Sequence, residues 1–200
     1  MKRIVVYCGS SGDVPQVYLD AAREMGRSLA ESGISLVYGG GATGLMGAVA
    51  DAVLENGGEV IGVTIEQFNS MELGHRNLTE LYVMDNLQER KTKMLDLSDG
   101  IVALPGGLGT FDELMEGLTW AQLGYHQKPV GLLNTNDYFD PLVSMLDHAR
   151  AEGFLFVKQA DLLISDSEPS RLLERLGSFR PQVDVAKRWA KQTGRSEEKP

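Results

Sequence analysis

The chain has 200 residues, of which 42% are apolar and 24% are charged. Its length is that of a single domain, and its composition is ordinary for a globular protein with a buried core. The net charge of −9 argues against a sequence-independent grip on nucleic acid or on an anionic membrane, because such binding needs a basic surface.

The cysteine count, the apolar runs and the histidine spacing bear on cellular location and on metal binding. The single cysteine, Cys8, excludes a disulfide framework and a cysteine-cluster zinc site within the chain. No apolar run approaches the length of a membrane span, and the N-terminus lacks the pattern of a signal peptide. The three histidines show no metal-ligand spacing. We therefore expect a cytoplasmic protein without a metal.

Short apolar runs alternate with stretches of helical spacing, and glycine turns separate them. Strands are predicted at residues 4–8, 35–38, 59–65, 81–84, 100–104, 130–133 and 162–164. Helices are predicted at about residues 15–32, 45–55, 86–98, 110–123, 138–151 and 168–176. Residues 66–79 show no clear period and are interpreted as a functional loop.

The strands are apolar throughout and alternate with helices, which predicts a parallel sheet covered on both faces. The expected fold is α/β: a Rossmann-like, doubly wound, mostly parallel sheet of about seven strands. We expect one nucleotide-binding domain over residues 1–179. Residues 180–200 carry six basic and three acidic side chains and are predicted to form a separate, partly disordered tail.

The first glycine loop, Gly39 to Gly44, follows a predicted strand and opens a predicted helix. Its G-x-G-x-x-G spacing can bring a phosphate close to the backbone, and Glu66 stands 22 positions after Gly44, where a ribose-binding acid is expected. A dinucleotide site is one interpretation. The other is a tight turn at which the helix packs closely on the strand.

The second glycine loop, Pro105 to Thr110, also joins a strand to a helix. Three glycines within four positions expose backbone N–H groups and form a potential nest for an anion. Thr110-x-x-Glu113 matches a capping box, in which the glutamate serves only the helix end. The same spacing also holds the Glu113 carboxylate within one turn of the nest, where it can reach whatever is attached to the phosphate.

The helix predicted at residues 86–98 carries Arg90 and Lys91 on the face where apolar residues are expected. Long basic side chains can snorkel around the edge of a core. Alternatively, the two cations point at an anionic ligand, since arginine presents a planar fork of donors that suits phosphate or carboxylate.

Three motifs together carry a resemblance to a known family. They are P-G-G-x-G-T-x-x-E at residues 105–113, Y-G-G-G-A-T-G-L-M-G at residues 38–47, and Glu89-Arg90-Lys91, with L-T-W-A-Q-L-G at residues 118–124 in support. The combination resembles the Lonely Guy family of cytokinin riboside 5′-monophosphate phosphoribohydrolases, which are often mislabelled lysine decarboxylases. The resemblance covers about residues 4–176. Nothing in the sequence identifies a Schiff-base lysine with pyridoxal partners.

The resemblance implies hydrolysis of the N-glycosidic bond in an N6-modified adenosine 5′-monophosphate, giving the free base and ribose 5-phosphate, with no cofactor. It implies that Arg90 and Glu113 are the catalytic pair and that the protein is a homodimer. The implied substrate-binding residues are Gly40, Gly41, Thr43, Glu72, Lys91, Gly106, Gly107, Leu108, Gly109, Thr110 and Thr119.

The implied chemistry suits these residue types. Glycoside cleavage passes through an oxocarbenium-like state, which a carboxylate such as Glu113 can stabilise, or for which it can activate water. Arginine is too basic to donate a proton, so Arg90 would position the substrate and stabilise charge. Three alternatives stay open: a general nucleotide 5′-monophosphate nucleosidase, an NAD-type oxidoreductase, and a non-catalytic nucleotide or cofactor carrier.

Overall fold

A computed structural model of the chain describes residues 1–70, 74–155 and 163–180. The described residues form a seven-stranded sheet in the order β4-β3-β2-β1-β5-β6-β7, and all six neighbouring pairs are parallel. This is the predicted doubly wound Rossmann-like fold. The strands are β1 (Arg3–Tyr7), β2 (Ser35–Tyr38), β3 (Val60–Ile65), β4 (Glu80–Met84), β5 (Gly100–Ala103), β6 (Val130–Leu133) and β7 (Ile164–Asp166).

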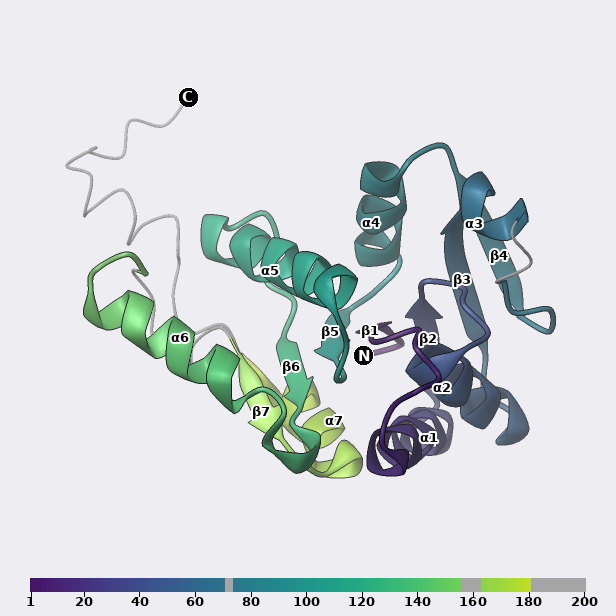
Figure 1. The fold of residues 1–200 in the computed structure, drawn as a ribbon, viewed down its shortest axis with the longest axis horizontal. Coiled ribbons are helices and arrows are strands. Elements are labelled where there is room, and N and C mark those ends of the chain that lie inside the picture. The colour runs from purple at the N-terminus through teal and green to yellow at the C-terminus, as the bar shows by residue number, and fades with distance from the viewer. Residues whose placement is uncertain (71–73, 156–162, 181–200) are drawn as a thin grey trace.

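Helices cover both faces of the sheet, as Figure 1 shows. One face carries α1, α2 and α7, and the opposite face carries α4, α5 and α6. The helices are α1 (Gln16–Glu31), α2 (Gly44–Glu55), α3 (Glu66–Ser70), α4 (Leu87–Asp96), α5 (Leu108–Leu123), α6 (Asp140–Ala151) and α7 (Pro169–Ser178), with the short 3-10 helix η1 (Thr135–Asp137) before α6.

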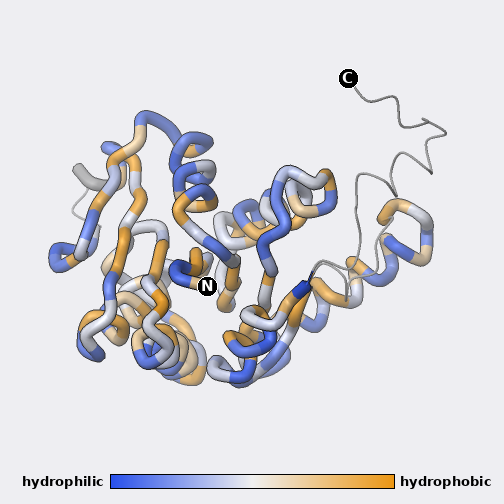
Figure 2. Tube along the Cα trace, turned by 180° about the vertical axis from the view of Figure 1, so that it is seen from behind, coloured by the Kyte–Doolittle hydropathy of each residue, from blue (hydrophilic) through white to orange (hydrophobic). Residues whose placement is uncertain are grey.

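A hydrophobic core lies on each face of the sheet, and the central strand β1 contributes to both because its side chains alternate between the faces. Ile4 and Val6 pack with α1, α2 and α7, whereas Val5 and Tyr7 pack with α4, α5 and α6. Figure 2 shows the resulting pattern, with hydrophobic positions along the strands and hydrophilic positions on the outer helix surfaces and loops. Because both faces of the sheet are covered, its central strands are apolar without interruption.

The order of the strands reverses at β1, which pairs with β2 on one side and with β5 on the other. In doubly wound sheets, ligands bind outside the carboxyl ends of the strands at such a switch point. Both glycine loops begin there, because the loop at residues 39–43 follows β2 and the loop at residues 104–107 follows β5. A backbone hydrogen bond from Gly9 N–H to the Pro105 carbonyl, 3.1 Å long, joins the β1 and β5 ends.

Most predicted elements are confirmed, with shifted ends. The interpretation of residues 66–79 as a loop without regular structure was wrong at its start, because Glu66–Ser70 form the short helix α3. The last strand spans Ile164–Asp166 and not residues 162–164, of which residue 162 lies outside the described part. Residues 181–200 also lie outside it, so the division at residue 179 stays a prediction.

Two further observations bear on location and metal binding. None of the helices in residues 1–70, 74–155 and 163–180 has both the length and the hydrophobicity needed to cross a bilayer. Within these same residues, no three histidine, cysteine, aspartate or glutamate side chains gather in a way that could hold a metal ion.

Candidate active site

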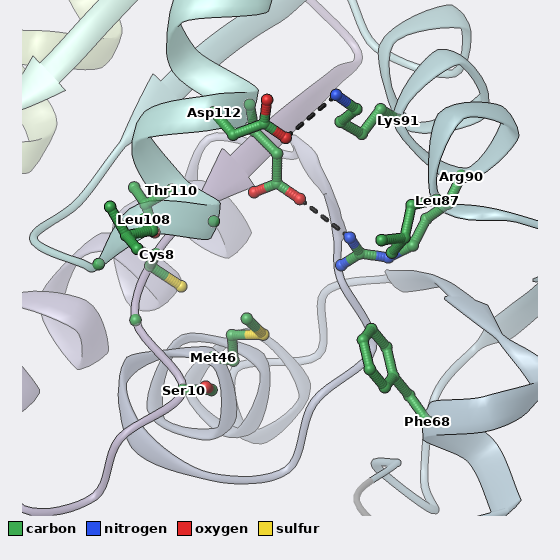
Figure 3. Close-up of a pocket in the computed structure, with 14 residues that line it drawn as sticks. Cys8, Ser10, Met46, Phe68, Leu87, Arg90, Lys91, Leu108, Thr110 and Asp112 are labelled. Atoms are coloured by element: carbon green, nitrogen blue, oxygen red, sulfur yellow. Dashed lines mark hydrogen bonds and ion pairs between the residues drawn. The ribbon is translucent and has the colours of Figure 1, made fainter.

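A cavity of about 430 Å³ lies at the switch point, and a second of about 230 Å³ adjoins it. Ser10, Met46, Phe68 and Arg90 line both, so the two spaces share a wall. In Figure 3 the residues of α5 face Arg90 and Leu87 of α4 across the larger cavity, with Met46 beneath. The larger cavity is also lined by Cys8, Gly9, Leu87, Lys91, Gly107, Leu108, Gly109, Thr110, Asp112 and Glu113.

Helix α4 begins with Asn86 as its N-cap, one turn before Arg90. The Asn86 side chain accepts a hydrogen bond from Glu89 N–H (2.9 Å) and donates one to the Glu89 carboxylate (2.8 Å). Arg90 therefore follows one turn into the helix and points inward, with only 8% of its surface exposed. The snorkelling interpretation was wrong for Arg90, because its guanidinium is buried and not at the solvent edge of the core.

Three of the five guanidinium donors of Arg90 have partners among the described residues. Its Nε donates to the Val63 carbonyl (2.9 Å), Nη1 to Glu113 Oε1 (3.0 Å) and Nη2 to the Gly39 carbonyl (3.5 Å). These bonds fix the plane of the guanidinium between β2, β3 and α5. Arginine carries five N–H donors, so two stay available to a ligand in the cavities that Arg90 lines.

Glu113 is the partner of Arg90 and not a helix cap. Helix α5 begins at Leu108, with Gly107 as its N-cap and no side-chain capping bond. Glu113 therefore stands almost two turns inside the helix, too far from the N-cap for a capping box. The capping-box interpretation was wrong because the helix starts before Thr110 and not at it. Only 11% of the Glu113 side chain is exposed, and it lines the larger cavity.

The pKa of Glu113 is raised above its ordinary value. Burial is the largest cause, because it penalises the charged carboxylate, and nearby Asp112 adds to it. The Arg90 guanidinium opposes this shift without cancelling it. A carboxyl group with a raised pKa, held against a fixed cation beside a cavity, is suited to accept a proton during a reaction.

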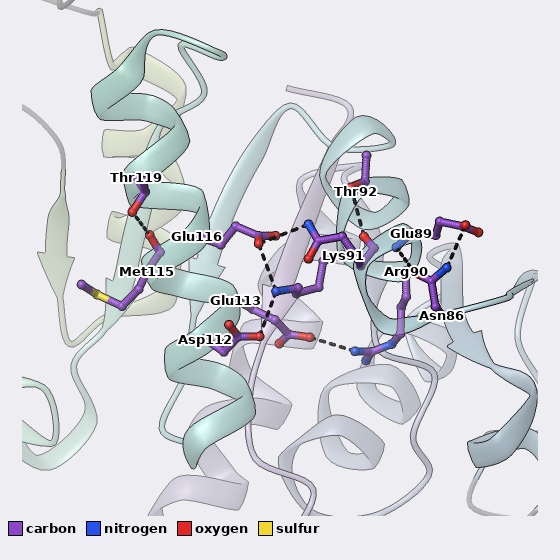
Figure 4. A network of polar contacts seen from close by, with 11 residues as sticks. Asn86, Glu89, Arg90, Lys91, Thr92, Asp112, Glu113, Met115, Glu116 and Thr119 are labelled. Carbon is purple, nitrogen blue, oxygen red and sulfur yellow. Dashed lines mark hydrogen bonds and ion pairs between the residues drawn. The ribbon is translucent and has the colours of Figure 1, made fainter.

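Lys91 forms a second link between α4 and α5. Its Nζ lies 3.0 Å from Asp112 Oδ2 and 3.0 Å from Glu116 Oε2 (Figure 4). Burial lowers the pKa of Lys91, but the hydrogen bonds and charges of Glu116 and Asp112 outweigh that effect, so the pKa is raised. Lys91 is thus a protonated lysine on the rim of the larger cavity.

The second glycine loop is tightly built on its inner side and open on its outer side. A Cβ at Gly106 would lie 2.2 Å from Thr110 Oγ1 and 2.8 Å from Gly9 N, so only glycine fits there. At Gly107 and Gly109 a Cβ would meet nothing within 4 Å. The uncapped N-terminus of α5 thus presents N–H groups and the positive end of the helix dipole to the cavity, an arrangement that suits a phosphate.

The structure brings most predicted residues together. Gly107, Leu108, Gly109, Thr110, Lys91 and the Arg90–Glu113 pair line the larger cavity, and Gly40, Gly41 and Thr43 line the smaller one. Gly106 supports the loop from behind the lining. Thr119 lies exposed on α5, donates to the Met115 carbonyl (2.7 Å), and faces neither cavity (Figure 4). Glu72 lies outside the described residues.

Sequence reasoning missed the apolar part of the lining. Met46, Phe68 and Leu87 come from α2, α3 and α4 and line the larger cavity. Met46 and Leu87 fall in predicted helices, and Phe68 falls in the stretch interpreted as a functional loop, so none of the three carries a signal of its own for a cavity. Leu87 shares the helix face of Arg90 and Lys91, and 51% of its surface is exposed. Glu66, the expected ribose-binding acid, opens α3 at the surface and lines neither cavity.

The fold and these cavities define a class: Rossmann-like proteins with a buried arginine–glutamate pair beside an open helix N-terminus. A family model described as "Possible lysine decarboxylase" matches residues 46–176. The cytokinin riboside 5′-monophosphate phosphoribohydrolase LOG of Oryza sativa subsp. japonica is 43% identical over 94% of this chain and 78% of its own length. That of Rhodococcoides fascians is 46% identical over 77% of this chain and 78% of its own length. The chain belongs to the Lonely Guy family of phosphoribohydrolases.

A likeness to solved structures extends the fold class further. The molybdenum cofactor binding protein from the phototrophic bacterium Rippkaea orientalis aligns with a TM-score of 0.67 and 23% identity, covering 89% of this chain and 97% of that chain. At this identity the likeness shows the shared fold alone. The shared fold therefore does not support the interpretation of this chain as a cofactor carrier.

The decarboxylase wording of the family model can be compared with the site. A lysine that forms a Schiff base needs a neutral amine, which a lowered pKa supplies. Lys91, which lines the larger cavity, has a raised pKa and two carboxylate partners. It is therefore held in the protonated form, which does not fit that role.

Proposed function

We propose that the protein hydrolyses the N-glycosidic bond of an N6-modified adenosine 5′-monophosphate, releasing the free base and ribose 5-phosphate. The observation that carries this proposal is the buried Arg90–Glu113 pair, 3.0 Å apart, which lines the same cavity as the open N-terminus of α5. The curated members of the family named above carry this activity in their names. The helix N-terminus at one part of the larger cavity suits the phosphate of a nucleotide, and the apolar residues at another part suit its base.

The phosphate is proposed to bind at Gly107, Leu108, Gly109 and Thr110. Their N–H groups and the helix dipole attract an anion without a buried side-chain charge. Binding there supplies energy remote from the reacting bond and orients the ribose toward Glu113. A nucleoside without its phosphate is therefore expected to react poorly.

The reaction is proposed to run through an oxocarbenium-like state at the anomeric carbon. The bond from that carbon to the base breaks, and the base leaves with the electron pair and takes up a proton from solvent, to which Glu113 afterwards returns the proton that it accepts. A water oxygen forms the new bond, and Glu113 accepts the proton of that water. The free N–H donors of Arg90 stabilise negative charge during the transfer, because an arginine cannot itself release a proton.

The base is proposed to lie toward Met46, Phe68 and Leu87. These apolar side chains line the larger cavity and can accommodate an apolar group on the N6 atom. Lys91, Gly40, Gly41 and Thr43 are proposed as further ligand contacts on the cavity walls. A general nucleosidase would release unmodified adenine at an equal rate, so the ratio of the two rates separates the alternatives.

The test is base release from adenosine 5′-monophosphate and from its N6-isopentenyl derivative, followed by chromatography. Glu113→Gln is expected to lower kcat by at least about 100-fold, the weight of one positioned acid–base group. Glu55→Gln, the same change at an exposed glutamate of α2, is the control and should leave the rate unchanged. Retained ligand without release in the unsubstituted protein would instead favour a carrier.

A homodimer is part of the proposal. Leu108, Met115 and Leu123 lie on one side of α5 and expose 87%, 39% and 51% of their surfaces, and Thr119 lies on the same side. An exposed apolar stripe of this kind is typical of a protein interface. Met115→Glu is expected to shift the mass measured by light scattering from two chains to one. A single-chain mass for the unsubstituted protein would contradict the dimer.

We also propose a cytoplasmic location and no nucleic-acid or membrane partner. The net charge of −9 disfavours both anionic partners. The lone cysteine, Cys8, is buried, and burial together with the nearby Glu113 charge raises the pKa of its thiol, which keeps it protonated and unreactive.

A further inference from the structure

The second glycine loop has a support from a distant part of the chain. Tyr138, in the connection between β6 and α6, donates a hydrogen bond from its Oη to the Gly106 carbonyl, with the two oxygens 2.5 Å apart. Its ring meets the Tyr18 ring edge-on, with the centroids 5.8 Å apart. Tyr138 does not line either cavity, so this bond reaches the loop from the side away from the ligand.

The bond sets the direction of one peptide group. The Gly106 carbonyl and the Gly107 N–H belong to the same planar trans unit and point in opposite directions. Since the carbonyl points to Tyr138, the Gly107 N–H points the other way, and Gly107 lines the cavity. The orientation that Tyr138 fixes is therefore the one that offers a donor, and not a carbonyl oxygen, to an anion.

A peptide between two glycines is unusually free to turn over, because no Cβ restrains it on either side. Turning the unit over would point the Gly106 carbonyl at the phosphate and remove one donor. It would also rotate φ of Gly107 by about 180°, from −98° to about +82°, a value that glycine accepts readily and alanine does not. A loop turned over in this way would bind anions poorly.

The connection that carries Tyr138 is itself strained. Asn136 and Asp137 both have left-handed backbones, with φ of 52° and 56°. Such conformations persist only where the surroundings hold them, and here Asn134 Oδ1 accepts a hydrogen bond from Phe139 N–H, 2.7 Å long. This strained turn places the Tyr138 hydroxyl within hydrogen-bonding distance of the Gly106 carbonyl.

We infer that Tyr138 is a positioning residue of the phosphate site, which it serves by holding the 106–107 peptide in its anion-binding orientation. The inference rests on the proposed function, because it assigns a role within the same site. Tyr138 acts through the backbone of Gly106 and Gly107 and does not touch the substrate.

The first test is Tyr138→Phe, which keeps the ring and removes the hydroxyl. We expect KM for the nucleoside monophosphate to rise about 3- to 10-fold, the weight of one neutral hydrogen bond, with kcat changed less than about 2-fold. The inhibition constant of inorganic phosphate should rise by the same factor. Tyr18→Phe removes a hydroxyl from the neighbouring ring and keeps the bond to Gly106, so it should change neither constant. Unchanged KM and phosphate inhibition in Tyr138→Phe would overturn the inference.

The second test separates peptide orientation from a general loosening of the structure. Gly107→Ala disfavours the turned-over state, and its Cβ meets no protein atom within 4 Å. Whatever this change does alone, the further effect of Tyr138→Phe on KM should shrink to less than about 2-fold in the Gly107→Ala background. An equal effect in both backgrounds would overturn the orientation mechanism. Asn134→Ala, which loosens the strained turn, is the second variant and should raise KM in the same way if Tyr138→Phe does not fold.

Failure of the proposed function has a different signature. If the unsubstituted protein hydrolyses no monophosphate, the function is overturned, and calorimetry with inorganic phosphate still compares Tyr138→Phe with the unsubstituted protein. Equal phosphate affinity in that comparison would overturn the role of Tyr138. If the unsubstituted protein is active and Tyr138→Phe is identical to it, only the role of Tyr138 is overturned.

Discussion

The two glycine loops look alike in the sequence but use their glycines for different reasons. In the loop after β2, a Cβ at Gly39 would lie 2.2 Å from Arg90 Nη2, and Gly40 and Gly44 have φ of +80° and +60°. In the second glycine loop, which runs into the first turn of α5, a Cβ at Gly107 or Gly109 would meet no protein atom within 4 Å. Gly39, like Gly106 of the second loop, makes room for neighbouring protein atoms, whereas Gly107 and Gly109 leave space that a ligand can fill.

This difference separates the placing of the reactive pair from the binding of the phosphate. The Gly39 backbone holds the Arg90 guanidinium through its carbonyl oxygen and through the absence of a side chain. Gly107 and Gly109 offer open backbone to the cavity. Substitution of Gly39 should therefore act on kcat, and substitution of Gly107 or Gly109 on KM.

Gly39→Ala should have the largest effect. The new methyl group would displace the guanidinium of Arg90, because that flexible end is the nearest atom. A misplacement of about 1 Å in a reactive group can cost about 100-fold, so we expect kcat to fall by about that factor with a small change in KM. Steady-state kinetics measure this, and a changed KM with normal kcat would contradict the separation of the two loops.

The pH dependence gives the second largest effect. The ionised form of Glu113 accepts the proton, and burial raises its pKa, so activity should fall as pH drops through a value above that of an exposed glutamate. Below that pH, kcat/KM should fall about tenfold per unit for a single proton. Gly39→Ala should move the midpoint to higher pH, because the Arg90 charge that lowers this pKa is displaced. Gly109→Ala should leave it in place.

Gly109→Ala should act on KM. Its methyl group would occupy part of the cavity next to the helix N-terminus, and we expect KM for the monophosphate to rise about 10-fold, which corresponds to ~1.4 kcal/mol. Alanine is the better helix former, so the melting temperature should not fall. A lowered melting temperature with unchanged KM would show that Gly109 serves packing, as the glycines of the first loop do.

Gly12→Ala is the smallest expected change and the matched control. A Cβ at Gly12 also meets nothing within 4 Å, but Gly12 lines neither cavity. Kinetics should be unchanged. The free energy of unfolding should rise by about 0.4–1 kcal/mol, because alanine has fewer unfolded conformations to lose, and thermal melts measure this. An altered KM here would show that open space alone does not identify the phosphate site.

The fold could be predicted because its signals are local and repeated. Apolar runs such as Val5–Tyr7, followed by glycine turns and helical spacing, recur along the chain and define a doubly wound sheet. Local signals do not give the exact start of a helix, and here a shift of the N-cap from Thr110 to Gly107 changed the role of Glu113. With Thr110 as the N-cap, Glu113 would be the glutamate of a capping box, whereas with the observed N-cap at Gly107 it is the partner of Arg90.

The remaining parts of the site depend on tertiary placement. Phe68 and Leu87 carry no periodic signal for a cavity, because only the packing of α3 and α4 around β3 leaves them beside it. The bond from Tyr138 to Gly106 joins residues 32 positions apart across two strands. Spacing rules describe neighbours on one element, so contacts of this kind lie beyond them.

The placement of the described cavity lining has a consequence for synthesis. Every lining residue of both cavities lies between Cys8 and Glu113, yet Leu172 and Leu176 of α7 complete the core behind β1. A ribosome adding about 5–20 residues per second needs roughly 3–12 s to pass from Glu113 to α7. The nascent chain therefore contains all of the described cavity-lining residues for several seconds before α7 covers its face of the sheet. We expect anion binding to appear only when α7 emerges.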